Sequence, residues 1–356
     1  MTDCCVPFPP TATSLLPQPW LDALPLVRCQ SSFVKPSFGC CASQRCLAAT
    51  HSRGVPCIQA TALHFASLGF HVYAGCLFPA SEAKLKANVV RTDGKHAPAS
   101  ADKITYVALD VTKDDSVQAA FDFISKDLDT TCTGVNKLVG VINCAGIAVT
   151  GPIEYLPVAM YQKQFDVNFF GYVRVAQKFL PLLRATAEDP AARRGRVVFV
   201  GTGGGVCTPT PGLLSAYMAS KFAGEAYIQV LRTEMALQGK RIDACMLNPG
   251  VVKPTGLADD GKANMVRFWA AVGEQAKDEY KWLFDRFEQF NEEQPGSHPH
   301  NVALGMEEIM RVGRPMVNYC VGFDSKAANF MGILPSRFTE WVYRAAIFQE
   351  TAWTPK

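Results

Sequence analysis

The chain has 356 residues, of which 48% are hydrophobic, and its formal net charge is +3. This length suits one large α/β domain with an appendage, or two small domains. A charge so close to zero argues against nucleic acid as the main partner. No apolar run reaches the roughly eighteen residues that a membrane-spanning helix needs, so none is expected.

The thirteen cysteines are unevenly spread, and seven of them lie between Cys4 and Cys57. None of them has the Cys-x-x-Cys spacing of a zinc site, so no metal site is expected. The other six mostly lie singly in apolar runs. They are interpreted as small core residues of a protein in a reducing compartment.

Residues 1–50 show none of the periodicity of a packed element. They are rich in Pro, Ser, Thr and Cys, and Asp3 and Asp22 are their only acids. This composition predicts a disordered or transit-like N-terminal segment. An alternative first exon or a mistaken gene start explains the segment equally well.

From Pro56 onward, helical and strand patterns alternate. Helices are predicted over 56–68, 81–90, 114–128, 158–186 (interrupted near Gly171) and 217–238. Strands are predicted over 70–76, 104–109, 137–142, 196–200 and 241–247. This alternation is typical of an α/β fold with a doubly wound parallel sheet. The predicted domains are a Rossmann-like domain over 51–256 and a lid with a C-terminal extension over 257–356.

Polar and small residues follow the predicted strands at their carboxyl ends, where parallel sheets bind ligands. These residues are Asp110, Asn143, Gly146, Thr202 and Pro249. Further along, Tyr217 and Lys221 are four residues apart on a predicted helix and therefore share one face. A nearby ammonium favours the phenolate, so the pKa of Tyr217 is expected to fall toward the working pH. Tyr217 is then a candidate general acid and base for interconverting an alcohol and a carbonyl.

Taken together, these motifs resemble the short-chain dehydrogenase/reductase superfamily over about residues 58 to 256. Asn143-Cys-Ala-Gly146 is similar to the Asn-Asn-Ala-Gly turn of that family, and Asp110-Val111 to the pair beside its adenine pocket. Asn168, the Tyr217–Lys221 pair and the Pro249-Gly250 turn match further family positions. The tail, Pro315 to Lys326 followed by Gly332-Ile-Leu-Pro335, resembles the retinol, hydroxysteroid and 3-hydroxybutyrate dehydrogenase subgroup.

The resemblance implies a set of catalytic roles. Tyr217 would exchange the hydroxyl proton, and Lys221 would lower its pKa and bind the cofactor ribose. Asn168 would hold a water molecule that links Lys221 to solvent. Thr202 takes the place of the family serine and would orient the substrate oxygen. Ser215 is the fallback for that role, and its alternative role is a helix N-cap.

The resemblance also implies a nicotinamide cofactor. NAD is favoured by the subgroup and NADP is the alternative, because Cys76-Leu-Phe-Pro carries neither a carboxylate for a ribose hydroxyl nor an arginine for a phosphate. The residues expected to bind the cofactor are Asp110, Val111, Asn143, Ala145, Gly146, Tyr217, Lys221, Pro249, Gly250 and Val252.

One departure concerns the turn that should cradle the pyrophosphate of the cofactor. Glycines let the backbone approach phosphate at a helix N-terminus. Here the window 51–58 holds a single glycine, Gly54, and the preceding Arg45–Thr50 is the only candidate for a first strand. Ser52, Pro56 and Ile58 stand near the glycine places of the family, so weak NAD(H) binding is expected.

Three interpretations remain open: a working dehydrogenase, a catalytically impaired relative that binds a ligand or partner, and a truncated product whose start is not native to the fold. The expected substrate is a lipophilic alcohol or carbonyl such as a retinoid or steroid, since the segment from Asn264 to Phe290 is rich in Trp and Phe. That segment could equally be an amphipathic helix on the sheet edge. The resemblance leaves open a homodimer, association with a membrane surface through residues 338–348, and an endoplasmic reticulum or mitochondrial location.

Overall fold

The computed structural model describes most of the chain after residue 55. The described ranges are 56–77, 103–131, 138–190, 192–203, 212–255 and 272–348, with isolated helical residues between 263 and 269 and the backbone of 45–49. The predicted helix over 81–90 and the rest of the N-terminal segment lie outside these ranges.

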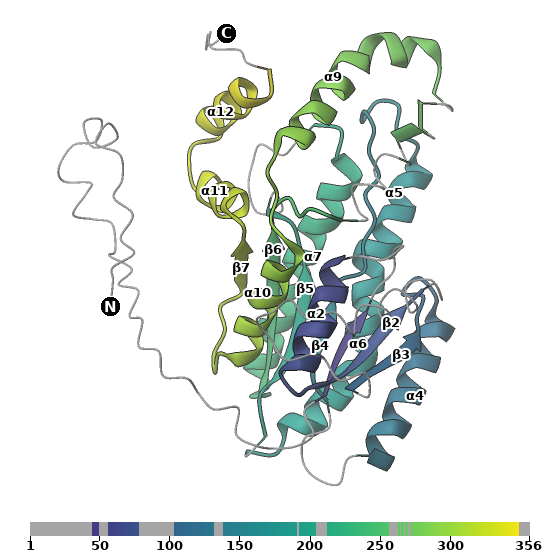
Figure 1. Ribbon diagram of the computed structural model, residues 1–356, viewed down its shortest axis with the longest axis vertical. Coiled ribbons are helices and arrows are strands. Elements are labelled where there is room, and N and C mark those ends of the chain that lie inside the picture. Colours follow the sequence, from purple (N-terminus) through teal and green to yellow (C-terminus); the bar gives the residue numbers. More distant parts are fainter. Residues whose placement is uncertain are drawn as a thin grey trace, which may run out of the picture. The chain divides into compact units, whose positions relative to one another are not determined.

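The described strands form one parallel sheet, as the alternating pattern predicted (Figure 1). Its order is β3-β2-β1-β4-β5-β6-β7. The strands are β1 (Arg45–Ala49), β2 (His71–Cys76), β3 (Ile104–Ala108), β4 (Leu138–Asn143), β5 (Gly195–Val200), β6 (Ile242–Pro249) and β7 (Asn318–Val321). The order reverses between β1 and β4, which is where doubly wound sheets leave a crevice for a ligand.

The first strand changes the predicted domain boundary. β1 pairs in parallel with β2 and with β4, so that Ala48 lies opposite both Ala74 and Ile142. Residues 45–49 were predicted to belong to a disordered or transit-like segment that ended at residue 50. The sheet therefore begins before residue 51, and the only candidate that the sequence offered for a first strand is an interior strand of the sheet.

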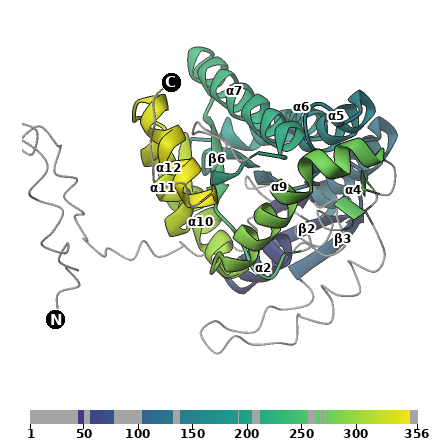
Figure 2. The same ribbon diagram turned by 90° about the horizontal axis from the view of Figure 1, so that it is seen from above.

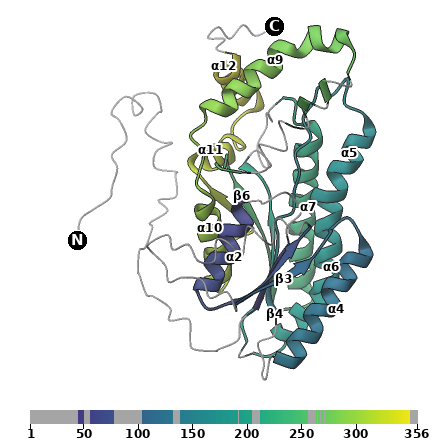
Figure 3. The same ribbon diagram turned by 45° about the vertical axis from the view of Figure 1, so that its right-hand side comes forward.

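Helices cover both faces of the sheet (Figure 3). On one face lie α2 (Pro56–Ser67) and α10 (Pro299–Arg311), which are joined by a 2.7 Å contact between Nε2 of His64 and a carboxylate oxygen of Glu307. On the other face lie α4 (Asp114–Thr131), α6 (Gly171–Ala187) and α7 (Ser215–Leu237). Because both faces are covered, every residue of β4, β5 and β6 is buried.

The long helical region after β4 is interrupted close to the predicted place. α5 (Val158–Phe165) runs into a π-helical turn, η2 (Asp166–Phe170), which leads directly into α6. Short π-helical turns inside α-helices are frequent at functional sites. This one carries Asn168, which is fully buried.

Part of the C-terminal region lies beyond the carboxyl ends of the strands. Figure 2 shows α9 (Glu274–Glu293) crossing over this end of the sheet. After β7 come α11 (Phe323–Met331) and α12 (Ser336–Phe348). Among the described helices, none combines the length and the hydropathy needed to cross a bilayer.

Candidate active site

The tyrosine and lysine predicted to form the catalytic pair lie on one buried face of α7. Tyr217 is 9% exposed and Lys221 is 5% exposed. Nζ of Lys221 lies 5.6 Å from the ring centroid of Tyr217, and it donates hydrogen bonds to the carbonyl oxygen of Val200 at 2.7 Å and to the hydroxyl of Tyr172 at 3.3 Å. The lysine is thus tied to the carboxyl end of β5.

Thr202, two residues after the end of β5, makes a side-chain hydrogen bond with Tyr217. Ser215, the fallback for the same role, is instead within 2.6 Å of the hydroxyl of Tyr161. Nor does Ser215 act as the N-cap of α7, because the helix begins at Ser215 itself and its N-cap residue, Leu214, makes no side-chain cap. The geometry therefore favours Thr202 as the hydroxyl beside the tyrosine.

Asn168 lies at the same end of the sheet and holds the segment after β4. Its Oδ1 accepts from the backbone N–H of Ile147 at 2.9 Å, and its Nδ2 donates to the carbonyl of Ile147 at 3.0 Å and to Oγ of Ser220 at 3.3 Å. A Cβ built on Gly146 would lie 3.7 Å from Oδ1 of Asn168 and 3.9 Å from Nζ of Lys221. The asparagine and the lysine therefore flank one point of the backbone.

Burial sets the protonation of this cluster. It shifts the pKa of Tyr217 upward, whereas the sequence led us to expect a fall. The pKa of Tyr217 is raised to about 12, because burial disfavours the phenolate more than the hydrogen bond from Thr202 stabilises it. Burial also lowers the pKa of Lys221 to about 8. The expected fall in the tyrosine pKa is therefore wrong for the protein without cofactor, in which the phenol is protonated at neutral pH.

A buried amide at the end of β4 fits a polar ligand. Asn143 is 1% exposed, and neither its Oδ1 nor its Nδ2 has a hydrogen-bond partner among the described residues. Unsatisfied buried amides cost free energy, so such a group calls for an explanation. Ala145 is buried and Gly146 half-buried directly after it. These residues stand at the carboxyl end of β4, beside the point where the strand order reverses, and fit a nicotinamide cofactor.

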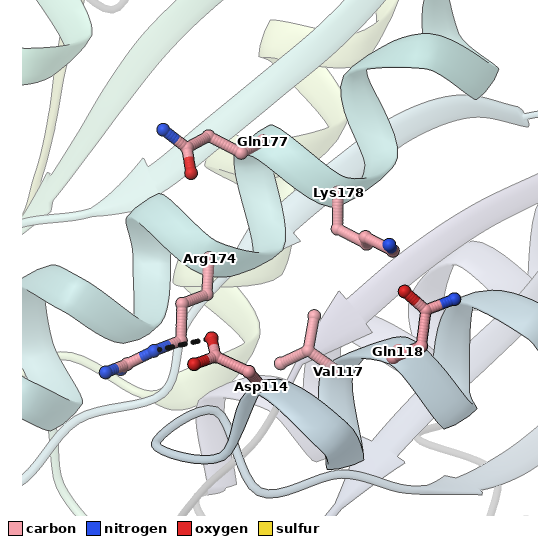
Figure 4. A pocket seen from close by; sticks show the side chains of 6 residues that line it. All are labelled: Asp114, Val117, Gln118, Arg174, Gln177 and Lys178. Atoms are coloured by element: carbon pink, nitrogen blue, oxygen red, sulfur yellow. Dashed lines mark ion pairs between the residues drawn. The ribbon is translucent and has the colours of Figure 1, made fainter.

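Asp110 and Val111, expected to border the adenine, follow β3. Oδ1 of Asp110 accepts from both the backbone N–H and the hydroxyl of Thr112, at 2.9 and 2.7 Å. Arg174 on α6 donates to the carbonyl of Val111 at 3.3 Å and pairs with Asp114 at 3.1 Å. Figure 4 shows this ion pair in a surface hollow between α4 and α6. None of the residues that line this hollow is one of the predicted site residues. Arg174 instead holds the segment after β3 through its hydrogen bond to Val111.

The turn after β6 carries the remaining predicted cofactor residues. Pro249 pairs with Val321 of β7, and Gly250 donates its N–H to the carbonyl of Val321 at 2.9 Å. Val252 is buried and bridges to Ser297, ahead of α10. The turn is thus held by two segments that lie far along the chain.

The turn expected to cradle phosphate lies largely outside the described residues. What the structure describes begins with Pro56 as the first residue of α2, followed by Cys57 and Ile58, both buried. Proline at this place removes one N–H donor from the helix start. Pro56 and Ile58, expected near the glycine places of the family, therefore both belong to the first turn of α2.

The sequence prediction missed Tyr172 as a hydrogen-bond acceptor for Lys221, and Ser220 as a partner of Asn168. Tyr172 follows Asn168 by four residues, and Ser220 directly precedes Lys221. Helical spacing therefore offered a signal for both, although it could not show which groups they meet. Among the described residues, no cluster of His, Cys, Asp and Glu could hold a metal ion.

Aromatic residues of the 264–290 segment pack over this end of the sheet. Phe268 and Phe284 are buried with Val149, Leu156, Leu213 and Ala216, which belong to the segment after β4 and the start of α7. The rings of Trp269 and Phe284 lie 4.4 Å apart. We call Phe268, Trp269 and α9 the insert. It packs against the residues next to Tyr217 and Ser215, and so borders the candidate site.

The chain resembles known enzymes in sequence. A dehydrogenase/reductase SDR family member 9 from Bos taurus is 29% identical over 271 residues, which cover 74% of this chain and 75% of that protein. A 3beta-hydroxysteroid dehydrogenase from Caenorhabditis elegans is 34% identical over 48% of this chain, and a mitochondrial D-beta-hydroxybutyrate dehydrogenase from Bos taurus is 32% identical over 53%. The matches span 41% and 49% of the lengths of these last two proteins.

Solved structures share the fold. A short chain dehydrogenase/reductase from Burkholderia phymatum, in complex with NAD, superimposes with a TM-score of 0.64 at 18% identity and covers 88% of this chain and 98% of its own. The structure of ElxO with NADP bound gives a TM-score of 0.58 at 15% identity, over 80% of this chain and 99% of its own. The short chain dehydrogenase family profile matches residues 58–265, more than half of the chain. With this match and this fold, the chain belongs to the short-chain dehydrogenase family.

Proposed function

We propose that this chain is a nicotinamide-dependent oxidoreductase that interconverts a lipophilic alcohol and its carbonyl compound. The observation that carries the proposal is the meeting of Tyr217, Thr202 and Lys221 at the carboxyl ends of β4 and β5. The family membership supports an oxidoreductase, and the named relatives include hydroxysteroid and hydroxybutyrate dehydrogenases.

The residues would divide the work as follows. A bound nicotinamide cofactor supplies the hydride in reduction and accepts it in oxidation. Tyr217, protonated at neutral pH, donates its proton to the carbonyl oxygen in reduction. Thr202 donates or accepts a hydrogen bond at the same oxygen. Lys221 and Asn143 would hold the ribose and nicotinamide end of the cofactor.

The protonation of Tyr217 gives the two directions of the reaction different pH dependences. Because the raised pKa keeps the phenol protonated, reduction needs no prior ionisation, whereas oxidation needs the phenolate. Carbonyl reduction should therefore proceed at neutral pH, and alcohol oxidation should speed up as the solution becomes alkaline. The resemblance to the subgroup favours NAD as the cofactor. NADP stays the alternative, because neither a carboxylate nor an arginine directly follows β2 to select between them.

The proposed substrate is apolar, for example a retinoid or a steroid. The insert offers buried aromatic side chains next to the start of α7, and such a cover excludes water from a pocket. The same surroundings would give a small hydrophilic ketone little to contact. A lipophilic substrate therefore fits the described surroundings of Tyr217 better.

The experiment is an assay of the purified full chain with NAD(H) and NADP(H) against retinal, a ketosteroid and acetoacetate. Tyr217→Phe should abolish turnover while leaving the circular dichroism spectrum unchanged, because it removes only the transferable proton. Thr202→Ala should lower kcat by about a hundredfold and Ser215→Ala far less, because Thr202 is hydrogen-bonded to Tyr217 whereas Ser215 is paired with Tyr161. Full activity of Tyr217→Phe would overturn the mechanism. Cofactor binding without turnover by the natural chain would favour the ligand-binding relative.

We further propose association with a membrane surface through α11 and α12. Phe323, Phe330, Ile333 and Phe338 expose between 48% and 88% of their surface. Apolar side chains on amphipathic helices suit the lipid interface. Flotation with liposomes tests this, and a chain left wholly in the unbound fraction would rule it out. A mitochondrial or endoplasmic reticulum location and a homodimer stay predictions, which cell fractionation and light scattering would check.

A further inference from the structure

The first turn of α11 contacts two segments that leave the sheet at the candidate site. α11 follows β7 through Gly322, whose φ of +95° lies in the region that favours glycine. Its residues Asp324 and Ser325 reach the turn after β6 and the loop after β5. That turn carries Pro249 and Gly250, and that loop carries Thr202.

Asp324 binds the backbone of the turn after β6. Its Oδ2 accepts from the N–H of Val251 at 2.5 Å. An acidic side chain in the first turn of a helix ordinarily stays with the amides of its own helix. Here the carboxylate spans 73 residues of sequence to satisfy an amide that follows the Pro249-Gly250 turn. A hydrogen bond to a carboxylate is stronger than one between neutral groups.

Ser325 is fully buried, and its hydroxyl donates to the carbonyl of Asn248 at 2.6 Å. The same residue touches the loop after β5, because a Cβ on Gly203 would lie 2.8 Å from Cα of Ser325. Gly203 directly follows Thr202, the partner of Tyr217. One serine thus contacts both segments that border the reacting groups.

Two glycines make this close approach achievable. A Cβ on Gly250 would lie 1.9 Å from Oδ1 of Asp324, and that separation is far below any real contact. The Cβ that Gly203 lacks would overlap Ser325 in the same way. The sequence therefore keeps glycine at the two places where α11 meets the turn and the loop. Any larger residue there would push them apart.

We propose that Asp324 and Ser325 are positioning residues, which set the Pro249-Gly250 turn and the Thr202 loop for the reaction. This inference rests on the proposed function, because it assumes that these two segments border the nicotinamide and the substrate oxygen. Neither residue needs to touch substrate or cofactor. A displacement of about 1 Å at reacting groups can cost a hundredfold in rate.

The fold itself should survive the loss of the Asp324 carboxylate. On its other side, the turn is tied to Ser297, whose N–H donates to the carbonyl of Val251 at 2.7 Å. Lys253 returns its N–H to the carbonyl of Ser297 at 3.0 Å. Removing the carboxylate therefore frees one side of the turn without detaching it from the molecule.

The test compares Asp324→Ala, Asp324→Asn and Ser325→Ala with Lys326→Ala, a change at an exposed residue of the same helix. Hydrogen exchange is measured first, without cofactor, on the peptide that spans Asn248 to Thr255. Asp324→Ala should speed exchange there by at least about tenfold, whereas Asp324→Asn, which keeps an acceptor oxygen, and Lys326→Ala should leave it unchanged.

Steady-state kinetics then separate positioning from a general structural role. For Asp324→Ala, kcat per folded molecule should fall by at least about tenfold, while KM for the cofactor changes by less than about threefold. Ser325→Ala should behave alike, and Asp324→Asn should recover most of kcat. Unchanged exchange, or faster exchange with unchanged kcat, would overturn the inference. If the natural chain shows no turnover, the proposed function fails, and exchange alone still decides whether Asp324 holds the turn.

Discussion

At the residue scale, the buried pair on α7 shows how burial and charge compete. Lys221 is almost wholly enclosed, and its ammonium is stabilised by one carbonyl and one tyrosine hydroxyl. That support does not replace water, so burial lowers the lysine pKa from its ordinary 10.5 to about 8. The sequence suggested that the Lys221 ammonium would act on Tyr217. In the protein without cofactor, burial makes that ammonium itself costly to maintain.

This lowered pKa has a measurable effect on stability. Below pH 8, both the folded and the unfolded chain carry the proton on Lys221, and the folded state bears the full cost of burying it. Between pH 8 and 10.5 the folded chain loses that proton first, so the contribution of Lys221 to the free energy of unfolding should rise with pH. The shift corresponds to a rise of about 3 kcal/mol for this one group. Buried thiols such as Cys57 and Cys245, whose pKa values burial raises to about 11, act in the opposite sense over this range, so the lysine has to be isolated by comparing variants.

Urea unfolding at pH 7.5 and pH 10, without cofactor, would measure this contribution. Lys221→Met should be more stable than the natural chain at pH 7.5, and this advantage should shrink at pH 10, whereas Lys326→Met, at an exposed lysine of α11, should differ from the natural chain by the same amount at both pH values. Parallel pH dependence in the natural chain and Lys221→Met would show that the lysine titrates normally.

At the scale of elements, the insert covers a candidate site that the sheet alone would leave open. Phe284 is 2% exposed and packs against Trp269, while Trp282, also on α9, is 57% exposed. The outer side of this contact is closed by hydrogen bonds from Tyr155 to Glu279 and from Tyr280 to Glu154. The apolar face of α9 thus packs against the segment after β4.

Phe284→Leu should loosen this cover without unfolding the chain, because it conserves most of the buried volume. We expect KM for a retinoid or steroid to rise by about tenfold, roughly the effect of one or two lost apolar contacts, with little change for acetoacetate. Trp282→Leu serves as the matched control and should leave both KM values unchanged. An equal loss for large and small substrates would count against the insert as a substrate cover.

Most of the elements could be predicted from the sequence because their patterns are local. Buried runs such as 138–143 and helical spacing such as that of 215–237 need no distant partner to be recognised. The first strand was harder, because Arg45–Ala49 is short and only its pairing with β2 and β4 defines it. The hydrogen bond from Val251 to Asp324 joins residues 73 positions apart, and no local pattern signals such a contact. The pKa of Tyr217 also depends on how deeply the folded chain buries its side chain, and the residue type alone does not reveal that depth.

At the scale of the whole molecule, cofactor affinity depends on the turn that links β1 to α2. By the resemblance, Pro56 and Ile58 stand near places where the family has glycine, and Ile58 is buried. We therefore expect NADH to bind this chain more weakly than micromolar, through Asn143 and Lys221. Isothermal titration calorimetry with NADH measures it directly.

A graft provides the comparison for that titration. Because β1 is already in place, only residues 51–58 need to be exchanged for a Thr-Gly-x-x-x-Gly-x-Gly turn. Restored micromolar affinity in the graft would assign the weakness to the missing glycines. Tight binding by the natural chain would show that the turn cradles phosphate without them, and an inactive graft would favour the ligand-binding relative.

The interior place of β1 in the sheet limits where the chain can be shortened from its N-terminal side. β1 is hydrogen-bonded on both sides, so its loss would leave β3-β2 and β4-β5-β6-β7 as separate ribbons, each with an unsatisfied inner edge. Such edges invite pairing with other chains, and aggregation would follow. Any cleavage that leaves the sheet intact must therefore lie before Arg45, and a chain expressed from residue 51 onward should be insoluble.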